Sequence, residues 1–447
     1  MSELPAGWAE TSLGAIGSVQ SGMGFPLEMQ GQTEGEYPVY KVGDISRGVL
    51  LDEGILRRST NYVDAEAAAV LKGHIFPEGS ILFAKIGEAL RLNRRAIIFR
   101  EGLADNNVMG FKAAQGIDDG FLYHFLRTQD LASLSRSTTI PSIRKSDVED
   151  ITISLPPLAE QKRIAQKLDA LLAQVDTLKA RIDAIPTLLK RFRKAVRASA
   201  LKGDLLSDSK EDSSAWNECT LSDLASVETG KTPDRSEANY WQAGSIPWVT
   251  SAATGLSFCK EAKEFVTPLA LRECSLKLFS PGTLLLAMYG EGKTRGQVTE
   301  LKIQAACNQA CAAISVNGEL ALQSFVKLRL EENYEAIRKM AVGGNQPNLN
   351  LGKVREIQFS LPSIATQTEI VLRVEQLFAY ADQLEAKVAA AKQRIDALTQ
   401  SLLAKAFRGE LVPQDPTDEP ASVLLERIRA KRAATPKPKR GRKAATR

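Results

Sequence analysis

The chain has 447 residues, 44% of them hydrophobic and 25% charged, which is ordinary for a soluble globular protein. This length exceeds what one hydrophobic core organises, so two or three folded units are expected. No apolar run is long enough to cross a bilayer, and residues 1–5 lack the basic and apolar regions of a secretory signal. These features argue against a membrane or secreted protein and predict a cytoplasmic one.

The cysteines argue against a zinc site. All five fall in the second half of the chain, without a C-x-x-C pair and without a nearby histidine: Cys219, Cys259, Cys274, Cys307 and Cys311. In a reducing compartment they are predicted to be buried free thiols.

The net charge of +5 is a property of the C-terminal tail. Residues 427–447 carry ten Lys or Arg and no acid, which leaves the rest of the chain at −5. Any nucleic-acid surface on the folded body must therefore be a local patch.

The chain repeats one plan twice. Residues 139–143 match residues 345–349, and residues 201–205 match residues 407–411, both at an offset of 206. Upstream the likeness is looser: residues 13–22 match 221–230 and residues 79–84 match 282–287, so loops of different length must separate the copies. A constant frame with divergent surfaces is expected of two readers of different ligands.

These matches divide the chain into mixed domains and long helices. The expected order is a first domain (1–155), a first helix (156–206), a linker (207–215), a second domain (216–361), a second helix (362–412) and a C-terminal segment (413–447) with a short helix at about 421–432 and a disordered basic tail from 435. Within the domains, residues 80–84 and 283–287 are predicted buried strands, and residues 121–128 and 322–333 are predicted helices. The fold class is therefore α+β.

Each long helix carries apolar residues in alternating steps of four and three, the heptad pattern of a coiled-coil seam. The predicted packing residues are Ile164, Leu168, Leu171, Val175, Leu178, Ile182, Ile185 and Leu189 in the first helix, and Ile370, Val374, Leu377, Leu384, Val388, Ile395, Leu398 and Leu402 in the second. The alternative interpretation is two ordinary helices, each packed on its own domain. Against it, roughly 40 residues at about 1.5 Å each give a helix of about 60 Å, which is longer than such packing needs. Pro186 lies inside the first helix and predicts a kink.

Catalytic motifs fail on inspection. Residues 287–294 satisfy a relaxed phosphate-loop pattern, but the next residues predict a turn and a strand instead of the required helix, and the first copy lacks Gly-Lys-Thr. Residues 155–158 lack the polar and aromatic neighbours of a methyltransferase Pro-Pro motif. His74 and His124 have no adjacent nucleophile or carboxylate arrangement and are predicted to be structural. No cofactor or metal is expected on this chain.

Polar and basic residues at matched places in the two copies are the candidate DNA contacts. Arg and Lys can meet phosphates or guanine edges, and Asn and Gln can read adenine, although the same residues also occur on solvated turns and as caps. The candidates are Lys85, Arg91, Arg94, Arg95, Arg136, Ser137, Thr139, Arg144, Lys293, Arg295, Asn345, Gln346 and Asn348.

The order of domain, long helix, domain, long helix resembles the specificity subunits of type I restriction-modification systems over nearly the whole chain. The most specific resemblances are the helix entry at residues 155–164, the strands at 79–84 and 282–287, and the closing residues 407–414. The second helix departs from the usual pattern, with residues 364–367 reading Ile-Ala-Thr-Gln where Glu-Gln is usual, and Pro186 is atypical.

The resemblance implies two target-recognition domains that each bind one half of a split, asymmetric DNA site. Two antiparallel helices would separate them in a pseudo-twofold arrangement and set the gap. It also implies two methyltransferase subunits, which carry S-adenosylmethionine, and restriction subunits, which use ATP and Mg²⁺, as partners of a non-catalytic chain. Two alternatives remain open: a scaffold joining two protein-binding modules, and a single-chain methyltransferase or NTPase.

Overall fold

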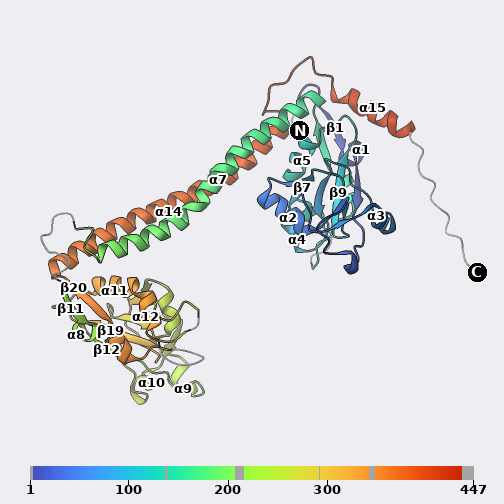
Figure 1. Cartoon of the computed structure of the whole chain (residues 1–447). Coiled ribbons are helices and arrows are strands. Elements are labelled where there is room, and N and C mark those ends of the chain that lie inside the picture. The colour runs from blue at the N-terminus through green and yellow to red at the C-terminus, as the bar shows by residue number, and fades with distance from the viewer. Residues whose placement is uncertain (1–3, 136–138, 207–215, 291, 342–347, 435–447) are drawn as a thin grey trace, which may run out of the picture. The chain divides into compact units, whose positions relative to one another are not determined.

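The computed structural model describes residues 4–135, 139–206, 216–290, 292–341 and 348–434. The predicted linker at 207–215 and the predicted tail from 435 lie outside these residues. The chain forms two compact units, residues 1–182 with 391–447 and residues 183–390 (Figure 1). Each unit therefore contains one of the two predicted domains together with a part of both long helices.

Domain 1 (residues 4–155) is a mixed α/β fold built on three small sheets. Its strands are β1 (Ala9–Ser12), β2 (Gly17–Ser21), β3 (Tyr37–Tyr40), β4 (Ile55–Leu56), β5 (Tyr62–Val63), β6 (Ile81–Ala84), β7 (Arg95–Ile98), β8 (Leu103–Ala104), β9 (Val108–Ala113) and β10 (Thr152–Leu155). Its helices are α1 (Leu13–Ile16), α2 (Val42–Leu51), α3 (Ala65–Leu71), α4 (Glu88–Arg91), α5 (Asp119–Thr128) and α6 (Lys145–Glu149).

Domain 2 (residues 216–361) is built in the same way. Its strands are β11 (Asn217–Thr220), β12 (Ala225–Thr229), β13 (Ile246–Val249), β14 (Phe258–Cys259), β15 (Glu264–Val266), β16 (Leu284–Ala287), β17 (Val298–Leu301), β18 (Ala306–Cys307), β19 (Cys311–Val316) and β20 (Gln358–Leu361). Its helices are α8 (Leu221–Leu224), α9 (Ala238–Trp241), α10 (Pro268–Glu273), α11 (Gln323–Glu332), α12 (Tyr334–Lys339) and α13 (Leu351–Arg355).

The two domains share one sheet topology, which confirms the repeat. The strand order β2-β9-β6-β7-β4 of domain 1 returns as β12-β19-β16-β17-β14, and β5-β3-β8 returns as β15-β13-β18. In both domains the first and last strands pair antiparallel, β1 with β10 and β11 with β20. The strands predicted at 80–84 and 283–287 are the central strands β6 and β16, and all four residues of each are buried because both faces of the sheet are covered. The helices predicted at 121–128 and 322–333 are α5 and α11.

The long helices are α7 (Leu158–Ala200) and α14 (Ile364–Phe407), and they pack antiparallel within each unit (Figure 1). In the first unit, Leu168 and Leu172 share a core with Leu403 and Ala406, while Lys179 Nζ lies 3.2 Å from Asp396 Oδ1. In the second unit, Val196 and Ala200 share a core with Ile370 and Val374, and Arg193 pairs with Asp382 at 2.6 Å and Glu385 at 2.8 Å. The antiparallel pair that was predicted is therefore present.

The predicted seam residues differ in how far they are buried. The side chains of Leu178 and Leu398 are 48% and 46% exposed, whereas Leu172 and Leu403, outside the predicted seam, are buried. A helix with 3.6 residues per turn drifts away from a strict seven-residue repeat, so the apolar contact shifts to neighbouring positions. The other predicted packing residues are buried or half-buried. Helix α7 continues through the exposed Pro186, and the kink stays a prediction.

One buried glutamine fixes the start of each long helix to its own domain. Gln161 Nε2 donates to Pro156 O at 2.9 Å, and its Oε1 accepts from the backbone N–H of Asp118 at the start of α5, at 3.0 Å. Gln367 makes the same two bonds, to Pro362 O at 2.9 Å and from Leu322 N–H at 2.8 Å. The side chains therefore satisfy two backbone groups that the helix entries would otherwise leave unpaired.

The residue before this glutamine differs between the copies, as the sequence indicated. Glu160 accepts a hydrogen bond from Trp8 Nε1 at 3.1 Å. In domain 2, Thr366 replaces the glutamate, and the buried Nε1 of Trp216 has no partner among the described residues. The second helix entry thus keeps the glutamine and loses the tryptophan contact.

The C-terminal segment packs onto domain 1. The predicted short helix is α15 (Ala421–Ala434), whose Leu424, Leu425 and Ile428 are buried in the domain 1 core. Arg432 donates to the carbonyls of Gly14 and Gly17, both at 2.6 Å, and Ala421 N–H donates to Gly7 O at 2.9 Å. The two ends of the described chain therefore meet on one domain.

The cysteines, all within described residues, form no disulfide. Cys259, Cys307 and Cys311 are buried as predicted, whereas Cys219 and Cys274 are half-buried. Burial raises the pKa of the Cys259 and Cys219 thiols, which keeps them protonated. Among the described helices, none is both long and apolar enough to span a membrane.

Candidate nucleic-acid interface

Three candidate residues of domain 1 come together where β6 ends. Lys85 follows the strand, and its carbonyl accepts from Ile143 N–H at 3.0 Å, while Gly87 N–H donates to Pro141 O at 2.8 Å. These bonds hold the segment with Thr139 and Arg144, both exposed, beside the half-buried Lys85. We call Lys85, Thr139 and Arg144 the strand-end surface of domain 1. Lys85 N–H also donates to Asn107 O at 2.9 Å, which ties this strand end to the turn before β9.

The arginines that follow β6 differ in accessibility. Arg91 is exposed, and its Nη1 lies 3.5 Å from Glu88 Oε1. Arg94 is half-buried. Arg95 is 2% exposed, its guanidinium donates to the carbonyls of Asn93 and Gln129, and burial lowers its pKa to about 10. A side chain in this position cannot reach a phosphate without leaving the core, so Arg95 holds the fold of domain 1 together.

Domain 2 presents a corresponding surface at the end of β16. Leu349 N–H donates to Met288 O at 3.1 Å, the equivalent of the bond between Ile143 and Lys85, and places the half-buried Asn348 beside this strand end. Lys293 is exposed and Arg295 half-buried on the turn to β17. Arg136, Ser137, Asn345 and Gln346, which were also predicted to contact DNA, lie outside the described residues.

Helix α12 anchors the turn that carries Lys293 and Arg295. Tyr334 Oη donates to Lys293 O at 2.7 Å, and the Arg338 guanidinium donates to Arg295 O at 2.9 Å and to Gly292 O at 2.8 Å. The turn then leads into strand β17, which confirms the predicted turn and strand. A phosphate loop needs a helix at that point, so the geometry is that of an anchored surface turn.

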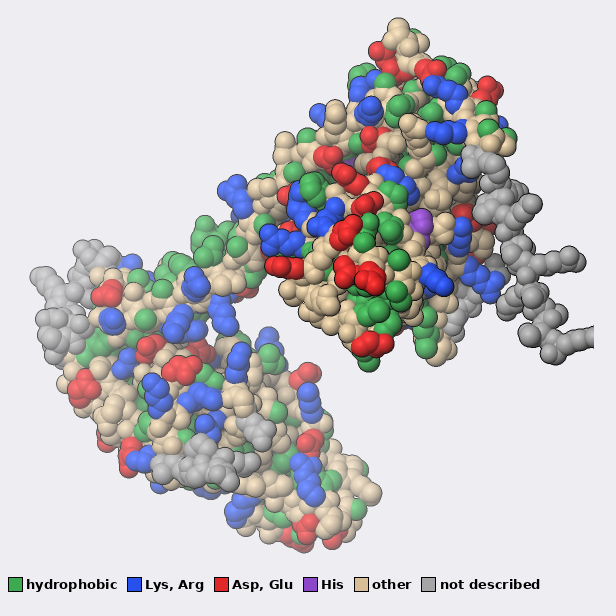
Figure 2. Space-filling view, turned by 45° about the vertical axis from the view of Figure 1, so that its right-hand side comes forward, with side chains coloured by type: hydrophobic (Ala, Val, Ile, Leu, Met, Phe, Trp, Pro, Cys, Tyr) green, Lys and Arg blue, Asp and Glu red, His purple; other side chains and the backbone are tan. Residues whose placement is uncertain are grey.

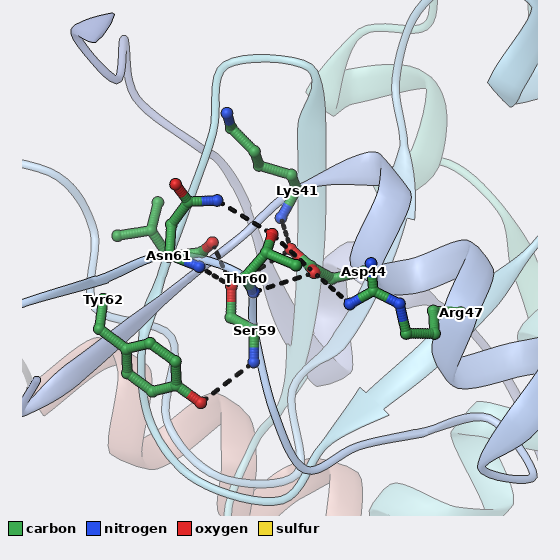
Figure 3. Close-up of polar contacts among 8 residues, drawn as sticks. Lys41, Asp44, Arg47, Ser59, Thr60, Asn61 and Tyr62 are labelled. Carbon is green, nitrogen blue, oxygen red and sulfur yellow. Dashed lines mark hydrogen bonds and ion pairs between the residues drawn. The ribbon is translucent and has the colours of Figure 1, made fainter. Parts of the chain in front are cut away.

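A buried carboxylate that the sequence analysis did not single out organises another part of domain 1. Asp44, near the start of α2, is 2% exposed and accepts from Lys41 N–H at 2.9 Å and from Thr60 N–H and the Ser59 and Thr60 hydroxyls at 3.2 Å each (Figure 3). Arg47 adds a longer contact of 3.4 Å. Only one half of a capping box is present, the Asp44 carboxylate accepting from the Lys41 backbone N–H, because a lysine side chain at the N-cap cannot accept a hydrogen bond in return.

The Asp44 network fixes the loop between β4 and β5. Val39 N–H donates to Asn61 O at 2.8 Å, and the Ser59 hydroxyl donates to Val39 O at 2.7 Å, so the loop is tied to β3 as well. The same loop carries the exposed Arg57, whose guanidinium lies 4.7 Å from the Phe99 ring centre, and the exposed Arg58. The arrangement presents cations from a rigid base.

The two histidines have structural contacts. The buried His124 has Nε2 2.8 Å from Asp169 Oδ1 and so joins α5 to α7, while the exposed His74 packs edge-on against Phe76. Within the described ranges, His, Cys, Asp and Glu form no group of three that could hold a metal ion. Figure 2 shows Lys and Arg mixed with Asp and Glu on the face of both units that it draws. Basic surfaces on that face are therefore local, as the charge distribution predicted.

Comparison with known families identifies the class of protein. Residues 5–187 and 213–391 match the type I restriction modification DNA specificity domain, so both halves of the repeat and most of the chain are covered. The chain belongs to the specificity subunits of type I restriction-modification systems.

Individual relatives agree with this assignment along the whole chain. The specificity subunit of the StySPI enzyme from Salmonella potsdam is 28% identical over 487 residues, covering 99% of each chain. That of the EcoDI enzyme from Escherichia coli is 34% identical over 351 residues, covering 72% of this chain and 79% of the relative.

Solved structures support the fold. A chain from a study of complex assembly and conformational transition of the type I restriction-modification system aligns with a TM-score of 0.71 at 18% identity, over 92% of this chain and 100% of that one. The HsdS subunit from Thermoanaerobacter tengcongensis aligns with a TM-score of 0.61 at 19% identity, over 92% and 99%.

Proposed function

We propose that this chain gives a type I restriction-modification complex its sequence specificity, with each domain reading one half of an asymmetric, two-part DNA site. The observation that carries the proposal is the combination of one shared sheet topology with different residues on equivalent surfaces. By the repeat offset the exposed Arg144 of domain 1 corresponds to the exposed Asn350 of domain 2, and by the strand offset the half-buried Lys85 corresponds to Met288, which is buried in the domain 2 core. Two readers of different half-sites require such a difference on a common frame.

In this proposal the antiparallel helices α7 and α14 set the gap between the half-sites and form the docking surface for two methyltransferase subunits. Those partners would flip and methylate the adenine with S-adenosylmethionine, and restriction subunits would supply ATP- and Mg²⁺-dependent cleavage. The chain itself would be non-catalytic and hold no cofactor. The failed phosphate-loop geometry and the structural setting of His124 support that division of labour.

The decisive experiment is to co-express the chain with its methyltransferase subunit and map N6-methyladenine in the host DNA by single-molecule sequencing. The expected result is a new two-part motif with a fixed gap, which is absent when this chain is omitted. A stable complex that adds no methylation would contradict the proposal and favour a scaffold that joins protein-binding modules.

The salt dependence of binding gives a second, independent measure. Phosphate contacts release counterions, so the affinity of the assembled complex for a duplex bearing the mapped motif should fall by orders of magnitude between about 50 and 200 mM salt. Binding that is insensitive to salt would contradict recognition through Lys and Arg.

A further inference from the structure

The turn between β8 and β9 of domain 1 returns in domain 2 with the same hydrogen bonds. Asp105 Oδ1 accepts from Asn107 N–H at 3.0 Å, and Val108 N–H donates to Asp105 O at 3.0 Å. Between β18 and β19, Asn308 Oδ1 accepts from Ala310 N–H at 3.2 Å, and Cys311 N–H donates to Asn308 O at 3.2 Å. Asp105 and Asn308 are therefore equivalent, and so are the tip residues Asn106 and Gln309.

Both turns are anchored in the same way to the strands around them. The backbone N–H of Asp105 donates to Tyr40 O at 3.0 Å, and that of Asn308 donates to Val249 O at 3.0 Å. On the other side, the carbonyls of Asn107 and Ala310 accept from Lys85 N–H at 2.9 Å and Met288 N–H at 2.8 Å. Each turn thus belongs to the strand end that carries the candidate contacts of its domain.

A glycine at the end of β2 and of β12 lets the chain pass close beneath each turn. A Cβ on Gly22 would lie 2.4 Å from Ala104 O and 2.0 Å from Asp105 O, and a Cβ on Gly230 would lie 1.7 Å from Cys307 O. Neither position accepts a side chain unless the turn moves, because heavy atoms do not approach so closely. The frame of the turn is therefore fixed in both domains.

The variable part of this fixed frame is the exposed tip, and both copies place a side-chain amide there. Asn106 and Gln309 are exposed. Gln309 is oriented by Thr232, whose hydroxyl donates to Gln309 Oε1 at 2.6 Å, and the Nε2 amide has no partner within the described residues. Asn106 makes no side-chain hydrogen bond to any described residue, so its amide also remains available to a ligand.

We propose that Asn106 and Gln309 are specificity-determining residues that each read an adenine edge in the major groove of one half-site. An Asn or Gln amide donates to N7 of adenine and accepts from its N6 amino group, and only adenine offers that pair of groups in this geometry. The inference rests on the proposed function, since it assigns the base contacts of the same two domains. Lys85 next to the domain 1 turn supplies the neighbouring positive charge that a phosphate contact needs.

The test is to map adenine methylation in cells that express the complex with Asn106→Ala or with Gln309→Ala. Each variant is expected to relax one specified A·T position in one half-site, by about tenfold in discrimination, while the other half-site and the gap stay unchanged. The two variants must affect opposite halves. Asn106→Asp, which keeps the shape and loses the donor to N7, should disfavour adenine at the same position.

Asn107→Ala is the matched control, because it removes a neighbouring exposed amide and gives domain 1 the alanine that domain 2 has at Ala310. It should leave the motif unchanged. If the original complex yields a two-part motif but Asn106→Ala and Gln309→Ala both preserve it, although they still assemble with the methyltransferase subunit, the inference is wrong and the proposed function stands. If the original complex yields no motif, the proposed function itself fails.

Discussion

Domains 1 and 2 share their strand order. They differ in the segment that follows β3 or β13, the central strand of the three-stranded sheet. After β3, the ten-residue helix α2 and the buried Asp44 fill the space next to the sheet. After β13, domain 2 has a single 3-10 turn (Ser251–Gly255) and a cavity of about 850 Å³ lined by Trp248, Thr250, Leu256, Lys260 and Lys263, among others. The equivalent of Asp44 by strand register is Ala253.

This difference indicates which parts of the fold are constrained. The central strands and the glutamine at each helix entry are common because they satisfy buried backbone groups and fill the core. The connections after β3 and β13 lie towards the surface, where each domain solves its local packing with different residues. Substitutions at the common positions should therefore destabilise both domains to a similar extent, whereas a substitution of Asp44 should destabilise domain 1 alone.

The largest effect is expected from removing the common glutamines. Gln161→Ala and Gln367→Ala each leave two buried backbone groups unpaired, which should lower the free energy of unfolding by about 3 kcal/mol in a urea titration. Gln166→Ala, at an exposed position of α7, is the control and should change it by less than about 0.5 kcal/mol. A similar small loss for the buried and exposed positions would show that the helix entries do not depend on these bonds.

A somewhat smaller and one-sided loss is expected from Asp44→Ala, about 2 to 3 kcal/mol, because the loop that donates its bonds to this carboxylate loses a buried, charged partner. The exposed Asp52, at the end of the same helix, provides the control variant Asp52→Ala. Hydrogen exchange by mass spectrometry should show faster exchange at residues 57–61 in Asp44→Ala and unchanged exchange in domain 2. Unchanged hydrogen exchange at residues 57–61 in Asp44→Ala would show that Asp44 does not stabilise this loop.

The two long helices also differ, and Pro186→Ala sharpens that comparison. Proline in a helix interior lacks the N–H donor and is up to about 3 kcal/mol less favourable than alanine, and the equivalent position in α14 is Lys392, which has no such cost. We expect the substitution to raise the melting temperature through a gain in stability of about 1 to 2 kcal/mol. An unchanged or lower melting temperature would mean that the helix has adapted its packing to the proline.

The smallest effect is expected at the surface ion pairs between the helices. Arg193 holds the pKa of Glu385 below its usual value of about 4.3, mainly through their hydrogen bond. A carboxyl whose pKa is depressed in the folded state stabilises the fold above its unfolded pKa and loses this contribution as the pH falls through the folded value. Arg193→Ala should therefore cost about 0.5 to 1 kcal/mol at pH 7, less at high salt, and progressively less as the pH falls through the depressed pKa of Glu385.

Lys179→Ala, which removes the single exposed contact with Asp396, is the comparison for that experiment. Its cost at pH 7 should be smaller than that of Arg193→Ala, because a guanidinium with two carboxylate partners gains more than a single flexible ammonium. An Arg193→Ala effect that is independent of pH would show that its aliphatic packing outweighs the ion pairs.

Much of the architecture was predictable because the repeat presents each element twice. The constant offset identified the helices, and the apolar runs at 81–84 and 284–287 identified the central strands. Leu178 and Leu398 of the predicted seam are about half exposed, because a strict heptad does not follow a helix with 3.6 residues per turn. The sequence shows that Thr366 departs from the Glu-Gln pattern of the helix entry, but the contact of the corresponding Glu160 with Trp8 is visible only in the fold.

The candidate site was harder to predict, because residue type does not reveal burial. Arg95 and Arg91 are both arginines after the same strand, yet Arg95 is buried and bound to carbonyls, and Arg91 is exposed. Asp44, Asn106 and Gln309 have no motif that separates them from ordinary loop residues. Only the matching strand registers of the two domains show that Asn106 and Gln309 are at equivalent positions.

The return of the C-terminal segment to domain 1 has a consequence for synthesis of the protein. The domain 1 core contains Leu403, Ala406, Leu424 and Ile428, and the ring of Phe407 lies 5.3 Å from that of Phe121. A chain emerging from the ribosome at about 5–20 residues per second would therefore expose part of this core for tens of seconds, while domain 2 is made and folds. The first domain to be translated is then the last to be completed, and during that interval it is the part of the nascent chain most in need of a chaperone.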